Sequence, residues 1–484
     1  MNGLSVLDRR PMPGRPRHYD FPDFSRSQLP NGLTLLRAHV PGRPLLQAQL
    51  VVHGDDLGVA SSEDPGQAGV SVLMARAMSE GTALRDAVAF VEAAERLGAS
   101  LATSAGWDVL SVQVEVPRAR LRQAMALLAE MALQPLFPER EVDRLREERL
   151  NDLKQVMADA HRRVDRLFAS VIYADEAAYG RPLGGSEETV PGLGRDALVT
   201  RHAGLLRAAA STLIVSGDLD GVPVAEIVAA AFDGWTDEHG TSEATAGDDG
   251  AGVVGAARNG LPRRPDAGRA SRRVVLVDRP GAPQSEIRVG HVGTPRRIGD
   301  FHALAVMNTV LGGLFNSRLN RLLREERGYT YGVGSSFDMR RAAGPFAVRC
   351  AVESEATAPA VADIMSELAR MREAEVGEDE LTTARDYLIG VFPLRFESSA
   401  QVGAALAGLV VHDLPDDELD RYRPAIAEVS AAAVLAAAYE HVDVERASIV
   451  VVGDIARFED ALREADLGEV EIVRDEGIDD GVEA

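Results

Sequence analysis

The segment 311–337 holds the residues whose types and spacing best suggest chemistry. It reads LGGLFNSRLNRLLREERGYTYGVGSSF, with Arg324 and Tyr331 seven positions apart. Gly328 between them ends a helical repeat, and an aromatic and β-branched run predicts a strand at 329–338. We expect the guanidinium of Arg324 and the hydroxyl of Tyr331 to lie close together as hydrogen-bond donors. The alternative, a solvated arginine and a core tyrosine, is favoured by spacing alone.

The elements needed to position these residues are predicted twice along the chain. Predicted strands and helices follow in the same order in both halves, and STLIVSGD at 211–218 recurs as ASIVVVGD at 447–454. A repeated order of elements indicates an internal duplication. We predict an α+β fold of two similar half-domains, each a mostly antiparallel sheet covered by helices.

The composition of the chain also predicts where these halves begin and end. We expect an N-terminal arm at 1–26, a first half at 27–235 and a second half at 273–465. Residues 236–272 are rich in Gly, Ala, Asp and Ser, which predicts a flexible linker. The last residues, 466–484, are predicted to form an acidic, frayed tail.

Segment 311–337 resembles the second half-domain of the M16 (pitrilysin/insulinase) peptidase family. The matching residues are Leu311-Gly312-Gly313, Ser317-Arg318-Leu319, Leu323-Arg324-Glu325 and Arg327-Gly328-Tyr329-Thr330-Tyr331. The resemblance implies that Arg324 and Tyr331 bind the substrate backbone and the carbonyl under attack, within a substrate-binding region that includes Gly312 and Gly313. It extends over roughly 27–235 and 273–460 and implies the same fold of two halves.

The first half lacks the catalytic residues that this resemblance leads one to expect. Active members carry His-x-x-Glu-His on a helix, where two His bind zinc and the Glu is general base. Here Val72 and Arg76 stand at the His positions and Ala75 at the Glu position. The family's third ligand aligns with Asn151 and Asp152, of which only Asp152 has ligand chemistry. We therefore expect no catalytic residue and no metal in this chain.

No other metal or nucleophile site is predicted in the sequence. Ten His are present, no two of them three to five residues apart, and Cys350 is the only cysteine. Charged residues make up 26% of the chain and the net charge is −23, which argues against nucleic acid and anionic membranes as partners. No apolar run has the length of a signal peptide core or a membrane span, so we expect a cytoplasmic protein.

The pattern of retained and lost motifs leads to a functional hypothesis. Some M16 peptidases are heterodimers in which one subunit carries zinc and the other holds the peptide by strand addition and by the Arg/Tyr pair. This chain resembles the non-catalytic, substrate-binding subunit of such a pair, acting on peptides or small unfolded proteins. It should be inactive alone, with zinc in the partner. Two alternatives are a structural subunit resembling bc1 core proteins and a homodimeric peptide-binding protein.

Overall fold

A computed structural model describes residue 14 and residues 17–53, 58–235 and 268–473. The predicted linker falls mostly outside the described residues, as do the beginning of the predicted arm and the end of the predicted tail. Two of the predicted boundaries are wrong. Residues 24–26 already belong to a strand, and a second strand lies inside the predicted acidic tail at 470–473.

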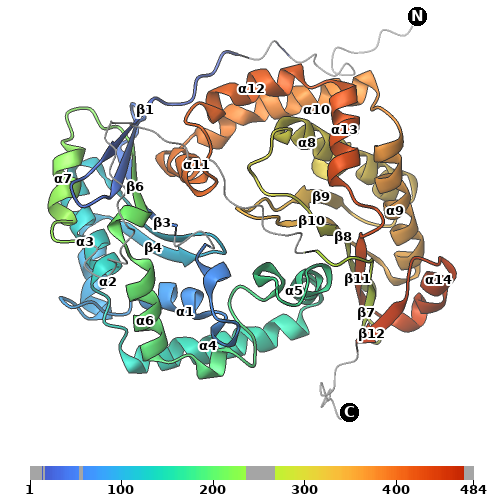
Figure 1. Cartoon of the computed structure of the whole chain (residues 1–484), viewed down its shortest axis with the longest axis horizontal. Helices are drawn as coiled ribbons and strands as arrows, with labels where there is room; N and C mark the ends of the chain where they lie inside the picture. Colours follow the sequence, from blue (N-terminus) through green and yellow to red (C-terminus); the bar gives the residue numbers. More distant parts are fainter. Residues whose placement is uncertain (1–13, 15–16, 54–57, 236–267, 474–484) are drawn as a thin grey trace, which may run out of the picture.

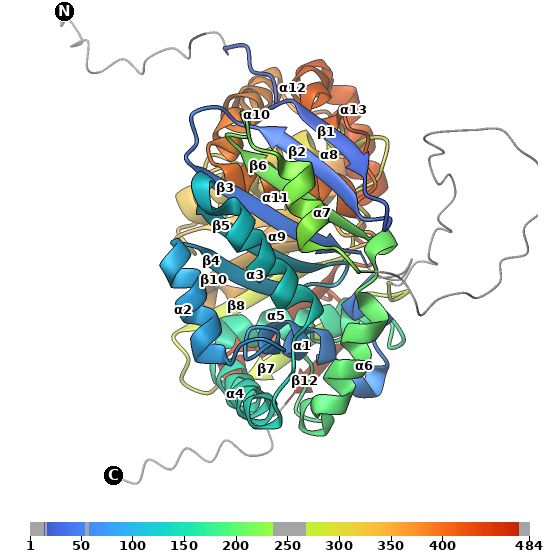
Figure 2. The same ribbon diagram turned by 90° about the vertical axis from the view of Figure 1, so that its left-hand side faces the viewer.

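The first half consists of one six-stranded sheet and its helices (Figures 1 and 2). The sheet order is β1-β2-β6-β3-β5-β4, so β4 is an edge strand. The elements are β1 (Phe24–Gln28), β2 (Thr34–His39), β3 (Leu45–Val52), α1 (Val70–Ala77), α2 (Ala87–Leu97), β4 (Ser100–Ala105), β5 (Leu110–Pro117), α3 (Leu121–Leu133), α4 (Glu139–Ala158), α5 (Ala160–Ile172), α6 (Arg195–Leu205), β6 (Ser211–Gly217) and α7 (Val224–Ala231).

The second half repeats this plan with the sheet order β12-β7-β11-β8-β10-β9. Its elements are β7 (Val274–Asp278), β8 (Gln284–Val292), α8 (Phe301–Asn308), η8 (Thr309–Gly313), η9 (Asn320–Glu326), β9 (Val333–Phe337), β10 (Pro345–Glu353), α9 (Thr357–Glu373), α10 (Glu378–Val391), α11 (Ser399–Val411), α12 (Glu418–Glu428), α13 (Ala431–His441), β11 (Ser448–Gly453), α14 (Glu459–Glu464) and β12 (Val470–Val473).

The predicted duplication is confirmed by the pairing of the two repeated strands. In each half, the strand with the repeated sequence (β6 or β11) runs parallel to one neighbour and antiparallel to the other. All residues of β6 and β11 are buried, because both faces of these central strands are covered. The α+β class and the mostly antiparallel sheets are as predicted.

The two halves exchange one helix each, which the sequence did not predict. Helix α5 is amphipathic, and its apolar residues 164, 168, 171 and 172 share one face. That face packs on β7 and β11 of the second sheet. In return, α11 packs Val402, Leu406 and Leu409 on β2, β3 and β6 of the first sheet. Figure 1 shows both helices between the two halves. On the face that contacts the exchanged helix, each sheet is therefore covered by a helix of the other half.

Several predicted element boundaries differ from the structure. The region 118–173 contains three helices, α3, α4 and α5. The break after α4 occurs at Asp159, which is extended and whose carboxylate accepts a hydrogen bond from Arg162 N–H to cap α5. The strand predicted at 329–338 begins only at Val333. Among the described residues, no helix has the length and apolar character needed to cross a bilayer.

Candidate functional site

Helix α1 carries the three positions that align with the zinc motif, and its orientation is fixed at both ends. It begins after Gly69, whose φ of +96° favours glycine. The buried carboxylate of Glu63 accepts hydrogen bonds from the N–H groups of Gly69 and Ser71 at 2.9 and 2.8 Å, which stabilises the helix N-terminus. Thr103 on β4 donates to the carbonyl oxygen of Ala75 at 2.6 Å. Helix α1 therefore lies directly beside the edge strand β4.

None of the three aligned side chains can donate an electron pair to a metal or accept a proton. Val72 is half-buried and Ala75 is buried, and both are apolar. Arg76 is exposed, and its guanidinium pairs with Glu148 on α4 at 2.9 Å. An arginine stays protonated at all physiological pH values, so it supplies a fixed positive charge instead of a ligand.

Glu148 belongs to a network of charges that connects α1 and α4. Its second oxygen pairs with Arg144 at 2.5 Å, and Arg144 also binds Glu80 at 2.9 Å and Glu141 at 2.7 Å. Arg144 donates hydrogen bonds to Glu141, Glu80 and Glu148, and these raise the pKa of Arg144 above its ordinary value. The carboxylates on this side of α4 are therefore already paired with arginines.

The structure assigns the carboxylate facing position 76 to Glu148, which the sequence comparison missed. Asp152 lies one helical turn further along α4 and binds Arg149 and Arg162 instead, with the Arg162 contact at 2.7 Å. The hydrogen bond from Arg162 lowers the pKa of Asp152. Asn151 is exposed. A signal was available, because Glu148 lies 72 residues after Arg76. The family resemblance implies a third ligand about seventy-five residues after the zinc motif.

The space between α1 and α4 does not fit a zinc site. The cavity lined by Gly69, Val72, Arg76 and Arg149 measures about 10 Å³, roughly the volume that one water needs. Within the described ranges, no three His, Cys, Asp or Glu side chains are grouped as metal ligands. Zinc requires neutral imidazole, thiolate or carboxylate donors in a tetrahedral set, and here the aligned positions offer two apolar side chains and a cation.

The second candidate region surrounds the segment 311–337, where the chain forms two π-helical turns, η8 and η9. A π-helical turn widens the helix and is common at functional sites. Gly312 packs so closely on β9 that a Cβ atom would lie 2.5 Å from the nitrogen of Ser335. Arg318 makes two hydrogen bonds of 2.8 Å to Glu380 on α10, which lower the pKa of that carboxyl. Gly312 therefore serves close packing here, and no contact tests a substrate-binding role for Gly312 or Gly313.

Two asparagines cover part of the outer edge of β9. The side chain of Asn320 accepts from the N–H of Val333 at 3.2 Å and donates to its carbonyl oxygen at 2.6 Å, as a neighbouring strand would. Asn308 donates to the carbonyl oxygen of Ser335 at 3.1 Å. An exposed strand edge is a pairing site for other chains. At these two residues of β9 that site is already occupied by side chains.

Arg324 is held in place on η9 by an aromatic ring. Its guanidinium carbon lies 3.4 Å from the ring centroid of Phe315, and it pairs with Glu325 at 2.7 Å. Its side chain is only 15% exposed, whereas Phe315 is 72% exposed. The interpretation of Arg324 as an ordinary solvated residue is therefore wrong. Phe315 is a further member of this region that the sequence analysis did not identify.

Tyr331 extends away from the protein just before β9. It is 97% exposed, so the alternative that it fills the core is wrong. Among the described residues, no hydrogen bond or ring contact joins Tyr331 to Arg324. Their close approach, expected from the sequence, stays a prediction. The chain thus places one immobilised guanidinium and one free phenol on the same short segment.

The two halves are connected where the hairpin tips of their sheets touch. Asp108, at the tip of the β4–β5 hairpin, accepts hydrogen bonds from the hydroxyl of Tyr179 at 2.7 Å and the N–H of Arg341 at 3.0 Å. Arg341 lies at the tip of the β9–β10 hairpin. The guanidinium of Arg340 lies over the rings of Trp107 and Tyr179, at 5.2 and 4.7 Å. The edge strands β4 and β9 therefore end at one shared contact.

Comparison with known sequences finds two matching family models and several similar proteins. Residues 57–185 match the insulinase family (peptidase family M16), and residues 192–388 match the peptidase M16 inactive domain. A Mycobacterium tuberculosis protein described as an uncharacterized zinc protease is 27% identical over 365 residues, covering 73% of this chain and 76% of its own. A Helicobacter pylori protein described as a non-peptidase homolog is 22% identical, covering 70% of this chain and 74% of its own.

Comparison with solved structures supports the fold. The peptidase M16 inactive domain from Pseudomonas fluorescens superimposes with a TM-score of 0.77 at 22% identity, over 89% of this chain and 98% of that chain. A protease from Helicobacter pylori gives a TM-score of 0.75 at 16% identity, over 90% of this chain and 100% of that chain. At these identities the likeness concerns the fold alone.

Proposed function

The chain belongs to the M16 peptidase family, and we propose that it is the non-catalytic, substrate-binding subunit of a heterodimeric zinc peptidase. The observation that carries this proposal is the contrast between Tyr331, which is 97% exposed, and the α1–α4 region, where Arg76 pairs with Glu148. The substrates are peptides or small unfolded proteins, and zinc is supplied by a partner subunit of the same family. The pair works in the cytoplasm.

The proposed contribution of this chain is to bind and polarise the peptide. As a peptide bond is hydrolysed, negative charge grows on its carbonyl oxygen, and correctly placed donors stabilise that charge. The hydroxyl of Tyr331 and the guanidinium of Arg324 are such donors. Stacking on Phe315 reduces the freedom of Arg324 before substrate binds, which lowers the entropy lost on binding.

The edge strand β4 is the proposed site for the peptide backbone. β4 is an edge strand of the first sheet and lies beside α1. The edge strand β9 of the second sheet is, in contrast, partly covered by Asn320 and Asn308. An extended peptide gains main-chain hydrogen bonds by adding to an open strand edge. The peptide would then lie between this chain and the zinc-bearing partner.

The test is peptidase activity of the reconstituted pair with Tyr331→Phe. Losing one donor to the developing charge costs about 3–4 kcal/mol, so we expect kcat to fall roughly 10²–10³-fold. Heterodimer formation, followed by size-exclusion chromatography, should be unchanged. The matched control is Tyr439→Phe, because Tyr439 is also exposed, at 67%, and lies beside Arg372, with 5.0 Å between guanidinium and ring.

Two outcomes would contradict the proposal. Equal activity of Tyr331→Phe and wild type would remove the substrate-binding role of Tyr331. If no zinc-bearing partner forms an active pair, the structural subunit becomes the better account. Peptide binding by a homodimer of this chain, without a zinc-bearing partner, would favour the alternative of a homodimeric peptide-binding protein. The H. pylori relative described as a non-peptidase homolog is a reason to test this alternative.

A further inference from the structure

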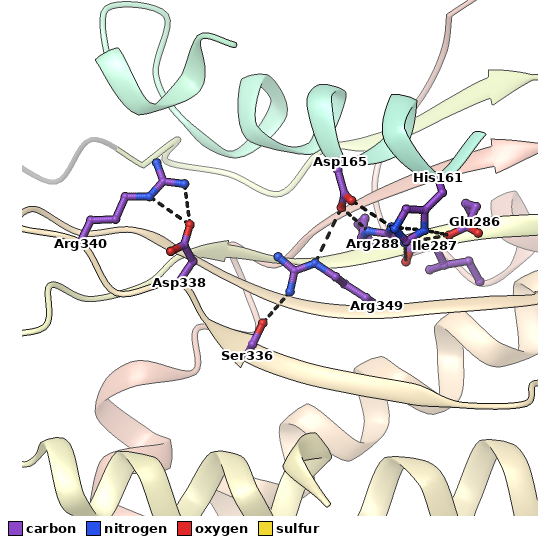
Figure 3. Close-up of polar contacts among 9 residues, drawn as sticks. All are labelled: His161, Asp165, Glu286, Ile287, Arg288, Ser336, Asp338, Arg340 and Arg349. Carbon is purple, nitrogen blue, oxygen red and sulfur yellow. Dashed lines mark hydrogen bonds and ion pairs between the residues drawn. The ribbon is translucent and has the colours of Figure 1, made fainter. Parts of the chain in front are cut away.

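A group of charged residues lies on the face of the second sheet that contacts α5 (Figure 3). Its centre is Arg288 on β8, which is 0% exposed. Arg288 binds Asp165 on α5 at 2.6 Å, Glu286 at 3.1 Å and the ring nitrogen of His161 at 3.1 Å. A buried charge requires such partners. Arg288 is therefore well paired, and it attaches the exchanged helix α5 to the second sheet.

Arg349 lies directly opposite Arg288 on the neighbouring strand β10, and its contacts are poorer. Its shortest contact is a hydrogen bond of 2.5 Å to the neutral hydroxyl of Ser336. Its nearest carboxylate oxygen, on Asp165, is 3.7 Å away, and the same atom binds Arg288 at 2.6 Å. Two like charges in directly opposite positions on a sheet repel each other.

Burial and the neighbouring charges both act on Arg349. Burial lowers the pKa of Arg349, and the positive charge of Arg288 lowers it further, while Asp165 and Asp338 oppose this effect. Asp338, however, already accepts hydrogen bonds from Arg340 at 3.0 and 2.6 Å. Asp165 is shared with Arg288. A further carboxylate beside Arg349 would therefore be stabilised by a guanidinium with five donors.

The guanidinium of Arg349 is partly open to solvent. Its side chain is 35% exposed. On β9, which forms that edge, the residue opposite Arg349 is Gly334, which has no side chain. Figure 3 shows the guanidinium between Asp165 and Ser336. A group that approaches the α5-facing side of the sheet therefore meets no β9 side chain opposite Arg349.

We propose that Arg349 and Ser336 bind a carboxylate of the substrate peptide and give this chain a preference for acidic peptides. The carboxylate is either a Glu or Asp side chain or the free C-terminus, because the guanidinium fork fits both. The inference rests on the proposed peptide-binding function and adds the substrate class. A local receptor is needed for this preference, since the net charge of −23 otherwise repels acidic peptides.

The experiment measures binding of extended fluorescent peptides to the full chain by anisotropy. The peptides differ only in Glu or Gln at one internal position, or in a free or amidated C-terminus, which separates the two sources of the carboxylate. We expect at least one acidic member to bind about tenfold more tightly than its neutral counterpart. Arg349→Met should abolish this difference and leave the neutral peptide unchanged, and Ser336→Ala should reduce it.

Two further variants separate recognition from structure. Asp165→Asn removes the carboxylate that competes for Arg349 but keeps an oxygen that can accept from Arg288, so it should increase the preference for acidic peptides. Arg457→Met removes the same charge from an exposed arginine that pairs with Glu355, and it should have no effect.

The outcomes distinguish this inference from the proposed function. If peptides bind but Glu and Gln, and acid and amide, bind equally, the inference is overturned and the proposed function stands. If Arg349→Met weakens acidic and neutral peptides alike, Arg349 is only structural. If no peptide binds wild type, the proposed function fails, and the inference fails with it.

Discussion

The α1–α4 region and the η9–β9 region occupy comparable places in the two halves. Helix α1 lies in the connection from β3 to the edge hairpin β4–β5, and η9 lies in the connection from β8 to the edge hairpin β9–β10. Their polar groups are used in opposite ways. In the first, Arg76, Glu148 and Arg144 satisfy one another across two helices. In the second, Tyr331 is 97% exposed and Arg324 is only stacked and paired with its neighbour on η9. A region whose charges are mutually paired has little to offer a ligand, whereas the other presents a free hydroxyl.

The edge strands of the two sheets show the reverse contrast. The edge of β9 is partly covered by the side-chain amides of Asn320 and Asn308, whereas β4 ends its sheet with no further strand beyond it in the described chain. The half that lost its metal ligands thus keeps an open edge, and the half that keeps the Arg/Tyr motif has a protected one. Binding of backbone and of carbonyl oxygen would then be divided between the two halves.

The largest effect is expected from restoring the zinc motif in α1. Wild type should bind no stoichiometric zinc. In the triple variant Val72→His, Ala75→Glu, Arg76→His, an imidazole replaces the cation beside Glu148, since Arg76 and Glu148 are 2.9 Å apart. The second imidazole, at position 72, lies one helical turn away on the same helix face. We expect nanomolar or tighter binding, about 12 kcal/mol, measured by metal analysis and competition with a chelator.

A pair of fourth substitutions tests which carboxylate completes that site. Adding Glu148→Gln to the triple variant should weaken zinc binding at least about a hundredfold, because even second-shell changes cost 10–100-fold. Adding Asp152→Asn should have little effect, since Asp152 faces Arg149 and Arg162. The opposite result would mean that the sequence alignment was right and the assignment to Glu148 wrong.

The acid stability of the molecule tests whether His53 and His412 are buried as neutral imidazoles near the touching hairpins. Burial lowers the pKa of His53 and of His412 to about 4, and the nearby charges include Arg341 for both, Arg26 for His53, and Asp108 and Arg296 for His412. In the unfolded chain both titrate near 6.5. Protons therefore bind the unfolded state first as pH falls, and stability decreases below about pH 6.5.

The expected loss is about 2 kcal/mol for each histidine between pH 7 and 5, measured by urea unfolding. His412→Leu cannot titrate and should remove about half of this dependence. If it leaves the pH dependence unchanged, His412 is not buried in its neutral form next to the hairpin contact.

The sequence predicted the architecture better than the contacts of the site. The repeated strands 211–218 and 447–454 located both central strands, because fully buried strands have a distinct apolar composition. The loss of ligands at Val72, Ala75 and Arg76 was readable for a similar reason, since residue type alone excludes the chemistry. The pairing of Arg76 with Glu148 was missed because the rotation of α4 about its axis and its packing on α1 decide which carboxylate faces Arg76. The two residues are 72 positions apart, so local sequence does not reveal this orientation.

The exchange of α5 and α11 could not be predicted either. An amphipathic helix predicts that one face will be buried, but its sequence does not specify which sheet covers it. Likewise, the spacing of Arg324 and Tyr331 did not reveal that Phe315 would stack on the arginine and the tyrosine would remain in solvent. Long-range packing decides these features, and local periodicity carries no information about it.

The last and smallest expected effects concern the contrast between the two sheet edges. Gly106 N–H donates to Val109 O at 2.8 Å to close the β4–β5 hairpin, so the next pair, Ala105 and Leu110, is non-hydrogen-bonded and the N–H of Ala105 points outward. Ala105→Pro removes that donor without breaking the ladder. If peptides add to β4, their affinity should fall about tenfold, or about 1.4 kcal/mol, with stability unchanged.

The matched variant at the other edge is Asn320→Ala, which leaves the N–H and carbonyl oxygen of the buried Val333 without their partner. It should cost about 2 kcal/mol of stability. If β4 is the binding edge, as proposed, peptide affinity should be unchanged. Anisotropy and urea unfolding of both variants give four values. If Asn320→Ala instead strengthens peptide binding and Ala105→Pro does nothing, then β9 is the edge that peptides use, and Asn320 competes with them for it.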